Sequence, residues 1–331
     1  MSQSLFARPA VLAAALLVGL GGLAASGAVL AQQKLRVAHV SSTDSLINQA
    51  LVRFADEVKE KSGGELTVTL YPDGQLGDEA PIADAVGAGA IDMGLGGALD
   101  AIDPRLNVVS LPFLFSDANN VHAFLDGPAG QALMKLGQDR NYVLLGALDS
   151  GFRQFANQKR PIHKPEDLAG LKVRTPPNPV ILATIKSLGA LPQAIPYGEV
   201  YTSLQSGVVD GVEPELRDFY DQKWYEAAQY VSMSNYVWSA NFWFMNKARY
   251  DKLSDPQRQV LHAAAANSVN WYRGKLDEVY ENITRAMKEK GVQFNDVDAA
   301  AFRDKVGPVY QQFAKEWGES FVDSVRTAAQ P

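Results

Sequence analysis

The order of predicted elements near the start of the chain constrains its fold more than any other feature. Residues 35–40 form a short apolar run, and residues 66–71 alternate apolar with polar positions, so both predict strands. Between them, apolar residues recur at helical spacing up to Ser62-Gly63-Gly64, where glycine ends the helix. A turn and a second helix start within residues 72–79, and residues 91–93 open a third strand. This alternation predicts a parallel sheet covered by helices, which is an α/β fold.

Residues 1–31 have the composition of a secretory signal peptide. Arg8 is the only charged residue in this segment, and an apolar run, residues 11–20, follows it. Val29-Leu30-Ala31 fits a small-x-small cleavage site, so the mature chain is expected to begin at Gln32. An uncleaved membrane anchor is the alternative, which the glycines within the apolar segment and the cleavage pattern disfavour.

Composition and charge exclude several classes of partner. The 331 residues carry a formal net charge of -6 and include no cysteine. An acidic chain argues against binding of nucleic acid or of an anionic membrane surface. Export without disulfides fits a bacterial periplasm and a fold large enough to be stable without them. About 300 residues after the leader suggest two domains.

One arginine is a candidate anion anchor. Arg174 stands at the end of a short apolar run, and Pro176, Pro177 and Pro179 then hold the backbone extended or turned. A guanidinium is always charged, and its rigid fork fits a carboxylate with two parallel hydrogen bonds. The residues by themselves leave a surface or salt-bridged arginine as the alternative.

The segments around Arg174 carry a family resemblance. They read GLKVR at 170–174, LGA at 188–190 and EVYTSLQSGVVDG at 199–211, followed by Glu213. Their order and spacing resemble the solute-binding proteins of tripartite ATP-independent periplasmic (TRAP) transporters, of the dicarboxylate-binding type. The resemblance covers essentially the whole chain after residue 31; further matching segments are residues 74–77, 89–93 and 111–117.

The resemblance implies a two-domain periplasmic binding protein of type II-like architecture, with the ligand held in a cleft. The expected domain I is residues 32–150 plus 241–279, and domain II is residues 151–240 plus 280–331. The aromatic segment 229–245 predicts hinge strands that cross between the domains. An apolar stripe between Leu261 and Met287 predicts one long helix laid across both domains.

The resemblance also implies a set of ligand-binding residues. Arg174 would clamp a carboxylate, Arg153 would add a second positive group, and Tyr197 would lie against the ligand body. Other members are expected at the hinge, at the pocket wall, or at the end of the first strand, where ligand loops gather in open α/β sheets. The full predicted set is Arg174, Arg153, Tyr197, Glu213, Trp238, Asn241 and His39.

One position departs from the family pattern. Many members carry an asparagine after Asp-Gly-x-Glu that donates to the ligand carboxylate, whereas this chain has Pro214 there. A hydrogen bond to a charged acceptor is worth about 1.5–3 kcal/mol. A different ligand pose or a different ligand is therefore expected, such as a small mono- or dicarboxylate or an acid with an apolar body. Glu215, the next residue, is expected to face solvent.

The function implied is capture of a small organic acid anion and its delivery to an ion-gradient-driven permease with a small and a large membrane subunit. A periplasmic ligand-sensing protein that reports to a membrane receptor is the alternative. An enzyme is not expected, because the chain contains no cysteine nucleophile, no H-E-x-x-H, no G-x-S-x-G and no P-loop. No cofactor, catalytic residue or metal ion is predicted.

Overall fold

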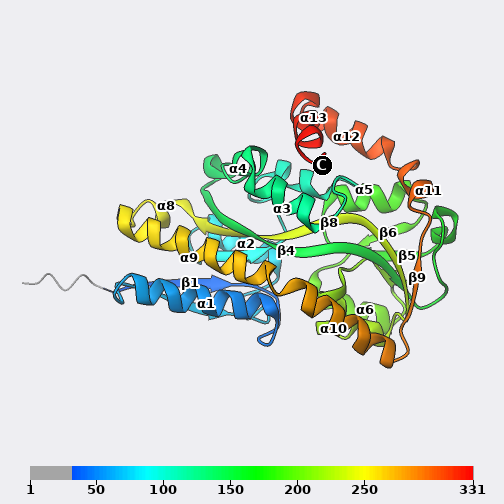
Figure 1. Ribbon diagram of the computed structural model, residues 1–331, viewed down its shortest axis with the longest axis horizontal. Helices are drawn as coiled ribbons and strands as arrows, with labels where there is room; N and C mark the ends of the chain where they lie inside the picture. Colours follow the sequence, from blue (N-terminus) through cyan, green and yellow to red (C-terminus); the bar gives the residue numbers. More distant parts are fainter. Residues whose placement is uncertain (1–31, 331) are drawn as a thin grey trace, which may run out of the picture. The chain divides into compact units, whose positions relative to one another are not determined.

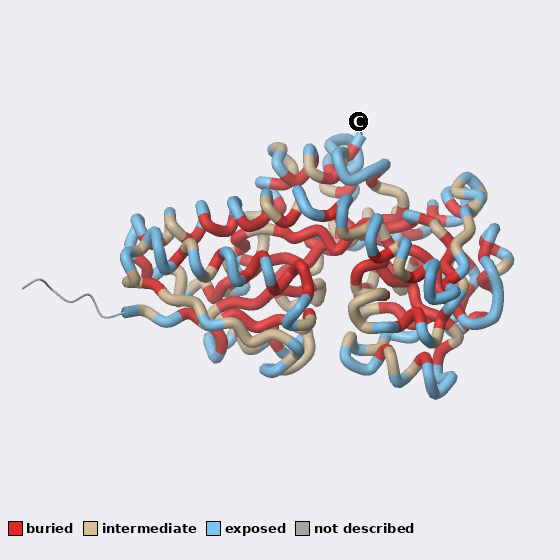
Figure 2. The backbone as a smooth tube through the Cα atoms, turned by 60° about the horizontal axis from the view of Figure 1, so that its bottom comes forward, coloured by how far each residue is buried: buried red, intermediate tan, exposed pale blue. Residues whose placement is uncertain are grey.

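The computed structural model describes residues 32–330, and the predicted signal peptide lies outside this part of the chain. Its nine strands form one mixed sheet in the order β2-β1-β3-β8-β4-β7-β5-β6, with β9 beside β8 (Figure 1). Buried backbone follows the strands, whereas exposed positions gather on the outer faces of the helices (Figure 2). Within residues 32–330, no helix is long and apolar enough to cross a membrane.

The first strands form the parallel unit that the order of elements predicts. β1 (Gln33–Ala38) pairs in parallel with both β2 (Leu66–Tyr71) and β3 (Met93–Gly96). α1 (Leu46–Lys61) and α2 (Glu79–Gly87) connect these strands. The prediction of a parallel sheet with helical connections is confirmed, and we name this part of the molecule lobe I.

Local sequence explains how α1 begins and which face it buries. The Ser45 side chain caps the helix by accepting a hydrogen bond from the backbone N–H of Asn48. Phe54 lies on the apolar stripe of α1 and is fully buried. Its ring meets that of Trp243 edge to face, with 4.3 Å between ring centroids. This contact fastens α1 to the sheet.

Two long strands connect lobe I with the rest of the sheet. β4 (Tyr142–Asn157) and β8 (Tyr230–Asn246) pair antiparallel from one end to the other, and we call this pair the ribbon (Figure 1). Their register shifts between Leu144 and Gly146, between Asp149 and Gly151, and again further along β4. Such bulges bend a strand pair and increase its twist. The crossing predicted for residues 229–245 is present as one long strand.

Lobe II is built on the second parallel group. β5 (Lys172–Thr175) lies between β6 (Leu191–Ala194) and β7 (Gly211–Val212) and is parallel to both. α5 (Pro179–Ser187) and α6 (Val200–Gln205) make the connections. Arg174 therefore stands on the central strand of this group, close to its carboxyl end.

The predicted long helix is present as two consecutive helices. α9 (Asp255–Arg273) ends at Gly274, and α10 (Leu276–Glu289) begins two residues later (Figure 1). Glycine is about 1 kcal/mol less favourable than alanine inside a helix, which favours the break at this position. α9 packs on the apolar core of lobe I, whereas Ile283 and Met287 of α10 pack in lobe II. The apolar stripe thus spans both lobes without being one continuous helix.

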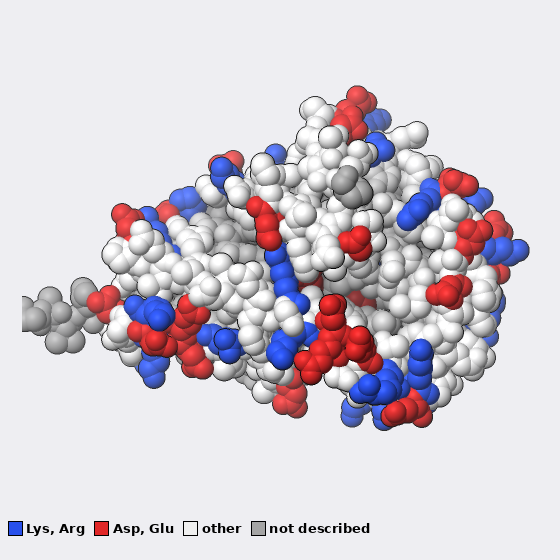
Figure 3. All heavy atoms as spheres, viewed as in Figure 1, with Lys and Arg blue, Asp and Glu red and all other residues white. Residues whose placement is uncertain are grey.

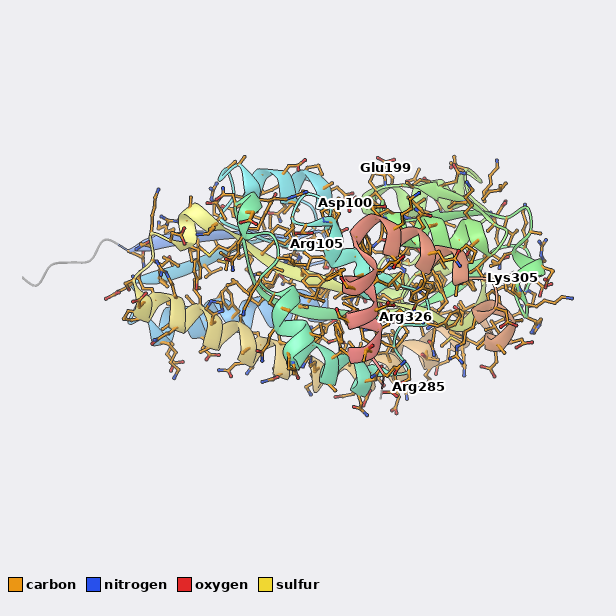
Figure 4. All side chains as sticks on the ribbon, turned by 90° about the horizontal axis from the view of Figure 1, so that it is seen from above. Asp100, Arg105, Glu199, Arg285, Lys305 and Arg326 are labelled. Carbon is orange, nitrogen blue, oxygen red and sulfur yellow. The ribbon has the colours of Figure 1, made fainter. Side chains whose placement is uncertain are left out.

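The C-terminal helices lie over the junction of the lobes (Figures 1 and 4). α12 (Gly307–Trp317) contacts α5 of lobe II, and α13 (Glu319–Ala328), which the sequence did not predict, contacts α4 (Pro128–Leu133). The boundaries given above for domains I and II stay a prediction.

The remaining elements are α3 (Ala118–Asp126), α4 (Pro128–Leu133), α7 (Leu216–Asp221), α8 (Lys247–Tyr250), β9 (Gln293–Asp296), α11 (Ala299–Arg303) and short 3-10 turns at Pro104–Ser110, Gln138–Arg140, Pro165–Leu168, Tyr197–Glu199 and Trp224–Glu226.

Truncating the buried aromatic ring of α1 tests this packing. Phe54→Ala should lower the free energy of unfolding by about 3–5 kcal/mol, because it leaves a cavity against Trp243. Urea unfolding of the chain from Gln32 measures the change. Val52→Ala on the exposed side of α1 is the matched control and should change stability by about 0.5 kcal/mol or less. Equal effects of the two variants would contradict the assignment of the buried face.

Candidate functional site

A cavity lies between lobe I and lobe II, on one face of the ribbon. The space in it that contains no protein atoms is about 620 Å³, open solvent included. The residues that line it are Glu79, Gly97, Leu99, Val109, Ser110, Ser150, Arg153, Arg174, Pro176, Asn178, Ile181, Tyr197, Pro214, Glu215, Asp218, Trp224, Ser239, Ala240 and Asn241. Four of the seven predicted residues are in this set, namely Arg174, Arg153, Tyr197 and Asn241.

Arg174 is a buried cation without a paired carboxylate among residues 32–330. Its side chain leaves β5 with only 3% of the residue exposed, and its Nε donates to the carbonyl oxygen of Ile195 at 2.9 Å. The Trp224 ring lies 5.7 Å from the guanidinium carbon. Burial lowers the pKa of Arg174 to about 10, although the charge of Glu213 opposes that shift. An anion in the cavity would compensate this charge.

Arg153, by contrast, is already paired. Both carboxylate oxygens of Glu213 accept hydrogen bonds from Arg153, one from Nε and the other from Nη2 at 2.9 Å. The hydroxyl of Tyr236 donates to the same carboxylate at 2.6 Å. Burial opposes the charge of Arg153, but the attraction of Glu213 outweighs it, so the pKa of Arg153 is raised. Glu213 does not line the cavity; the structure places it behind Arg153 as that residue's partner.

An aromatic wall closes one side of the cavity. Tyr197 and Trp224 meet edge to face, with 5.3 Å between their ring centroids. Burial raises the pKa of the Tyr197 hydroxyl well above its usual value, so the hydroxyl is neutral. Trp224 is absent from the predicted set. It lies in a short turn after Lys223, and nothing in the local sequence distinguishes it from a core aromatic.

Lobe I contributes a carboxylate that the sequence did not single out. Glu79 opens α2, and its Oε1 accepts from the backbone N–H of Gly97 at 3.2 Å. Burial raises the pKa of Glu79 to about 7; Asp78 and Asp218 add to that rise, whereas the Gly97 N–H and Arg174 oppose it. The local sequence could have identified Glu79, because a Gly-Asp-Glu sequence after a strand places acidic residues at a helix start, where ligands gather.

Asp78 links the two lobes next to Glu79. One carboxylate oxygen of Asp78 caps α2 by accepting from the backbone N–H of Glu79 at 2.6 Å. The other accepts from the backbone N–H of Gly198, in lobe II, at 3.1 Å. One side chain therefore both starts the helix that carries Glu79 and fixes that helix against the opposite lobe.

Two members of the predicted set lie away from the cavity. His39 is fully buried behind the end of β1, with its Nε2 3.2 Å from the Asn48 side-chain oxygen, and burial lowers its pKa to about 4. Trp238 packs edge to face on Phe115. Because side chains alternate along a strand, Trp238 of β8 points to the face of the ribbon opposite the cavity, whereas Ser239 lines it.

The expectation that Glu215 faces solvent is wrong. Only 1% of Glu215 is exposed, and its carboxylate accepts from Nη2 of Arg217 at 3.0 Å and from the backbone N–H groups of Arg217 and Asp218. It caps the start of α7, and the Tyr280 hydroxyl reaches it at 3.1 Å. A helix start buried between the lobes needs an internal acceptor for its N–H groups, which explains the burial.

The described part of the chain contains no cluster of three or more histidine, aspartate or glutamate side chains that could hold a metal ion. On the face shown in Figure 3, small groups of acidic side chains lie next to small groups of basic ones. The chemistry of the cavity therefore comes from Arg174, Arg153, Glu79 and the neutral polar and aromatic groups between them.

The chain is similar to known proteins over most of its length. The model of the bacterial extracellular solute-binding proteins, family 7, matches residues 37–316. The 2,3-diketo-L-gulonate-binding periplasmic protein YiaO of Escherichia coli (strain K12) is 33% identical over 302 residues, which cover 90% of this chain and 92% of that protein. The C4-dicarboxylate-binding periplasmic protein DctP of Rhodobacter capsulatus is 29% identical over 302 residues, which cover 89% of this chain and 90% of that protein.

A solved structure shows the same architecture. The crystal structure of a TRAP periplasmic solute binding protein from Polaromonas sp. JS666, bound to D-erythronate, matches with a TM-score of 0.86 at 30% identity. The match covers 89% of this chain and 98% of that chain. Two of these proteins are named for different acids and the third was solved with a third acid bound, so the likeness leaves the ligand open.

The raised pKa of Glu79 predicts a pH-dependent gain in stability for Glu79→Gln. A carboxyl whose pKa rises from 4.5 to about 7 on folding destabilises the native state as the pH increases through that window. The variant should therefore be more stable than the parent by about 2–3 kcal/mol at pH 8, and this advantage should vanish near pH 4. Urea unfolding at both pH values measures it.

Glu60→Gln, on the exposed side of α1, is the matched control and should show no such pH-dependent difference. A stability difference for Glu79→Gln that is the same at pH 4 and pH 8 would show that Glu79 ionises normally in the folded chain.

Proposed function

Because the chain belongs to the bacterial extracellular solute-binding proteins of family 7, a transport family rather than an enzyme family, we propose that it captures a small organic acid anion between its lobes. Arg174 carries the proposal: it is buried, borders the cavity and has no carboxylate partner among residues 32–330. A cation buried in this way is unfavourable until an anion joins it.

The geometry of Arg174 suggests how the ligand binds. Its Nε is already used by the carbonyl oxygen of Ile195, which leaves the two terminal nitrogens to donate to a carboxylate. Two parallel charge-assisted hydrogen bonds would hold the ligand carboxylate, while Tyr197 and Trp224 flank the ligand body. Arg153 keeps Glu213 as its partner. Its Nη1 donates to the Ser239 hydroxyl at 3.3 Å, and the second N–H of Nη1 would be available to the ligand.

Closure of the lobes would complete capture. Ligand contacts from both lobes stabilise the closed arrangement and shift the population toward it. The Asp78–Gly198 hydrogen bond joins the two lobes directly and would stabilise the same closed arrangement. The closed form would then dock on a membrane permease with a small and a large subunit, and an ion gradient through that permease would drive uptake. This assignment rests on the family, as does the placement of the chain in the periplasm.

Removing the guanidinium tests the carboxylate clamp. Arg174→Ala should weaken binding of the cognate acid by about 100-fold, because two hydrogen bonds to a charged group are lost. A thermal-shift screen of small organic acids finds the ligand, and isothermal titration calorimetry measures the loss. At 100 times its dissociation constant, a ligand should stabilise the parent protein by about 2.7 kcal/mol.

Arg285→Ala is the matched control, since Figure 4 shows Arg285 at the outer edge of α10, and Arg285 does not line the cavity between the lobes. Binding by this variant should equal that of the parent. A loss of tenfold or less in Arg174→Ala would remove the clamp from the proposal.

The proposed leader is tested separately. Expression of the full chain in a bacterial host with export machinery should release a periplasmic protein whose first residue is Gln32. Intact-mass measurement with N-terminal sequencing checks this. Recovery of the uncleaved chain from the membrane fraction would support the membrane-anchor alternative instead.

A further inference from the structure

We propose that a groove on the opposite face of the ribbon is a second ligand site, for a small uncharged aromatic molecule that carries a hydroxyl group, and that its occupancy favours the closed arrangement of the lobes. The site itself does not depend on the proposed function. Its effect on acid binding rests on that function, because it presumes that the lobes close around the acid.

The groove and the cavity share the ribbon as a common wall. Phe152 of β4 and Trp238 of β8 line the groove, whereas the next residue of each strand, Arg153 and Ser239, lines the cavity. Side chains alternate between the two faces of a strand, so the two spaces lie on opposite faces. The space in the groove that contains no protein atoms is about 1500 Å³, open solvent included. Ala118 at the start of α3 borders it on one side and α10 on the other (Figure 1).

The floor of the groove is apolar and partly exposed. Phe152, Met233 and Tyr280 are half-buried, and the buried Leu216 and Leu276 complete the floor. Apolar surface gathered in one hollow marks a binding site, whereas scattered apolar residues do not. Aromatic rings pack well against other rings and against a methionine sulfur. The floor therefore favours a ligand with an aromatic body.

The polar groups at the rim favour a ligand without charge. Exposed charged side chains of α10 stand there, namely Asp277, Glu281, Arg285, Lys288 and Glu289. Exposed charges of both signs are screened by water and salt, so they give little preference for an anion or a cation. The Asn235 amide adds a donor, since its oxygen already accepts from Gln154 at 2.6 Å.

One buried acceptor in the lining lacks a donor. Asp149 is 2% exposed; its Oδ1 lies 3.0 Å from Nε2 of His122, and its Oδ2 forms no hydrogen bond within residues 32–330. Arg273 balances its charge from 3.6 Å, which is beyond hydrogen-bond distance. A buried acceptor without a donor is unfavourable. A ligand hydroxyl can supply the donor without adding charge.

Both lobes form the walls of the groove. Ala118 lies on α3, whose Val121 packs in the same apolar core as Ile82 of lobe I. Leu216 packs with Val212 of β7 in lobe II. Because the ribbon connects the lobes and separates the groove from the cavity, a rotation that opens the cavity narrows the groove. An occupant of the groove would resist this rotation and so stabilise the closed arrangement.

Tyr280 gives the two spaces a direct contact. Its ring lines the groove, and its hydroxyl lies 2.7 Å from the carbonyl oxygen of Ser150 and 3.1 Å from Glu215 Oε2. Ser150 and Glu215 both line the cavity. A ligand that packs on the Tyr280 ring therefore also holds part of the cavity wall.

The experiment uses one ring skeleton with different substituents. Isothermal titration calorimetry on the chain from Gln32 compares 2-naphthol with 2-naphthoate, 2-naphthylmethylamine and the saturated decahydro-2-naphthol. Thr284→Trp and Met233→Trp fill the groove, and Asn282→Trp, on the exposed outer side of α10, is the matched control. Arg174→Ala separates 2-naphthoate bound in the cavity from 2-naphthoate bound in the groove.

The parent should bind one molecule of 2-naphthol at least tenfold more tightly than the other three compounds. Both groove-filling variants should lose at least tenfold in affinity for 2-naphthol, and Asn282→Trp should bind like the parent. Saturating 2-naphthol should tighten binding of the cognate acid about fivefold or more, and the acid should tighten binding of 2-naphthol by the same factor.

A second readout of closure needs no acid. The chain has no cysteine, so Val52→Cys on α1 and Lys186→Cys on α5 place one spin label on each lobe, both at exposed positions. 2-Naphthol should shift the distribution of distances between the labels toward that of the Thr284→Trp protein.

Other outcomes overturn the inference in distinguishable ways. Failure of 2-naphthol to bind the parent, or binding that both groove-filling variants leave unchanged, would overturn the site. Tightest binding of the amine, or of 2-naphthoate to Arg174→Ala, would overturn the uncharged class. 2-Naphthol that binds without moving the labels would remove the effect on closure. Binding of no organic acid would overturn the proposed function alone, while 2-naphthol binding that depends on Thr284 and Met233 would still support the site.

Discussion

The buried pair of Arg153 and Glu213 sets the charge pattern on which the cavity depends. Arg153 extends from β4, Glu213 follows β7, and Tyr236 of β8 donates to the same carboxylate. Three strands are thereby tied through one fully buried acid. Removing either member of such a pair costs about 3–5 kcal/mol, because the other charge stays buried without a partner. Since both carboxylate oxygens of Glu213 accept from Arg153, Glu213 forms no ion pair with Arg174, which remains available to an anion.

The cavity holds two opposite charges that do not pair with each other. Burial moves both groups toward their neutral forms, lowering the pKa of Arg174 and raising that of Glu79. A direct ion pair between them would relieve this cost but would leave nothing for a ligand to satisfy. Perturbed pKa values of this kind collect at functional sites because such sites keep charges without their best internal partners. The protein without ligand is therefore less stable than it would be if Arg174 and Glu79 formed an ion pair.

The ribbon of β4 and β8 gives each of its faces a different environment. Phe152 and Trp238 are directly paired on the face opposite the cavity, while Ser239 and Arg153 line the cavity. A register shift between Asp149 and Gly151 bends the ribbon at this point. Gly151 has a φ of +112°, and a side chain there would collide with the Tyr280 hydroxyl, so only glycine fits.

Contacts between distant segments show why proximity had to come from the structure. Asp78 and Gly198 are 120 positions apart, yet a hydrogen bond of 3.1 Å joins them across the lobes. The Ala240 and Asn241 oxygens face Glu79 beside Gly97 because β8 lies next to β3 in the sheet. Nothing in the local sequence of any of these segments indicates the contact, which depends on how the sheet is ordered.

By itself, the sequence determined the elements and their order. The α/β alternation, the parallel first strands and the apolar stripe of α9 and α10 all follow from periodicity and from Gly and Pro positions. These are local properties, which depend on the residues within one segment and not on the segments packed against it. The arginine fork of Arg174 could be identified in the same way, from its chemistry and its place at a strand end.

Tertiary structure decided which polar groups remain unmatched. Sequence placed His39 and Trp238 in the cavity and Glu215 in solvent. The fold buries His39 and Trp238 away from the cavity, buries Glu215 at its edge, and brings Glu79 and Trp224 to the cavity. The reason is that partnership is a long-range property. Whether a buried charge is satisfied depends on what the opposite strand, lobe or helix start supplies, and one register step of β8 moves a side chain from the cavity to the opposite face.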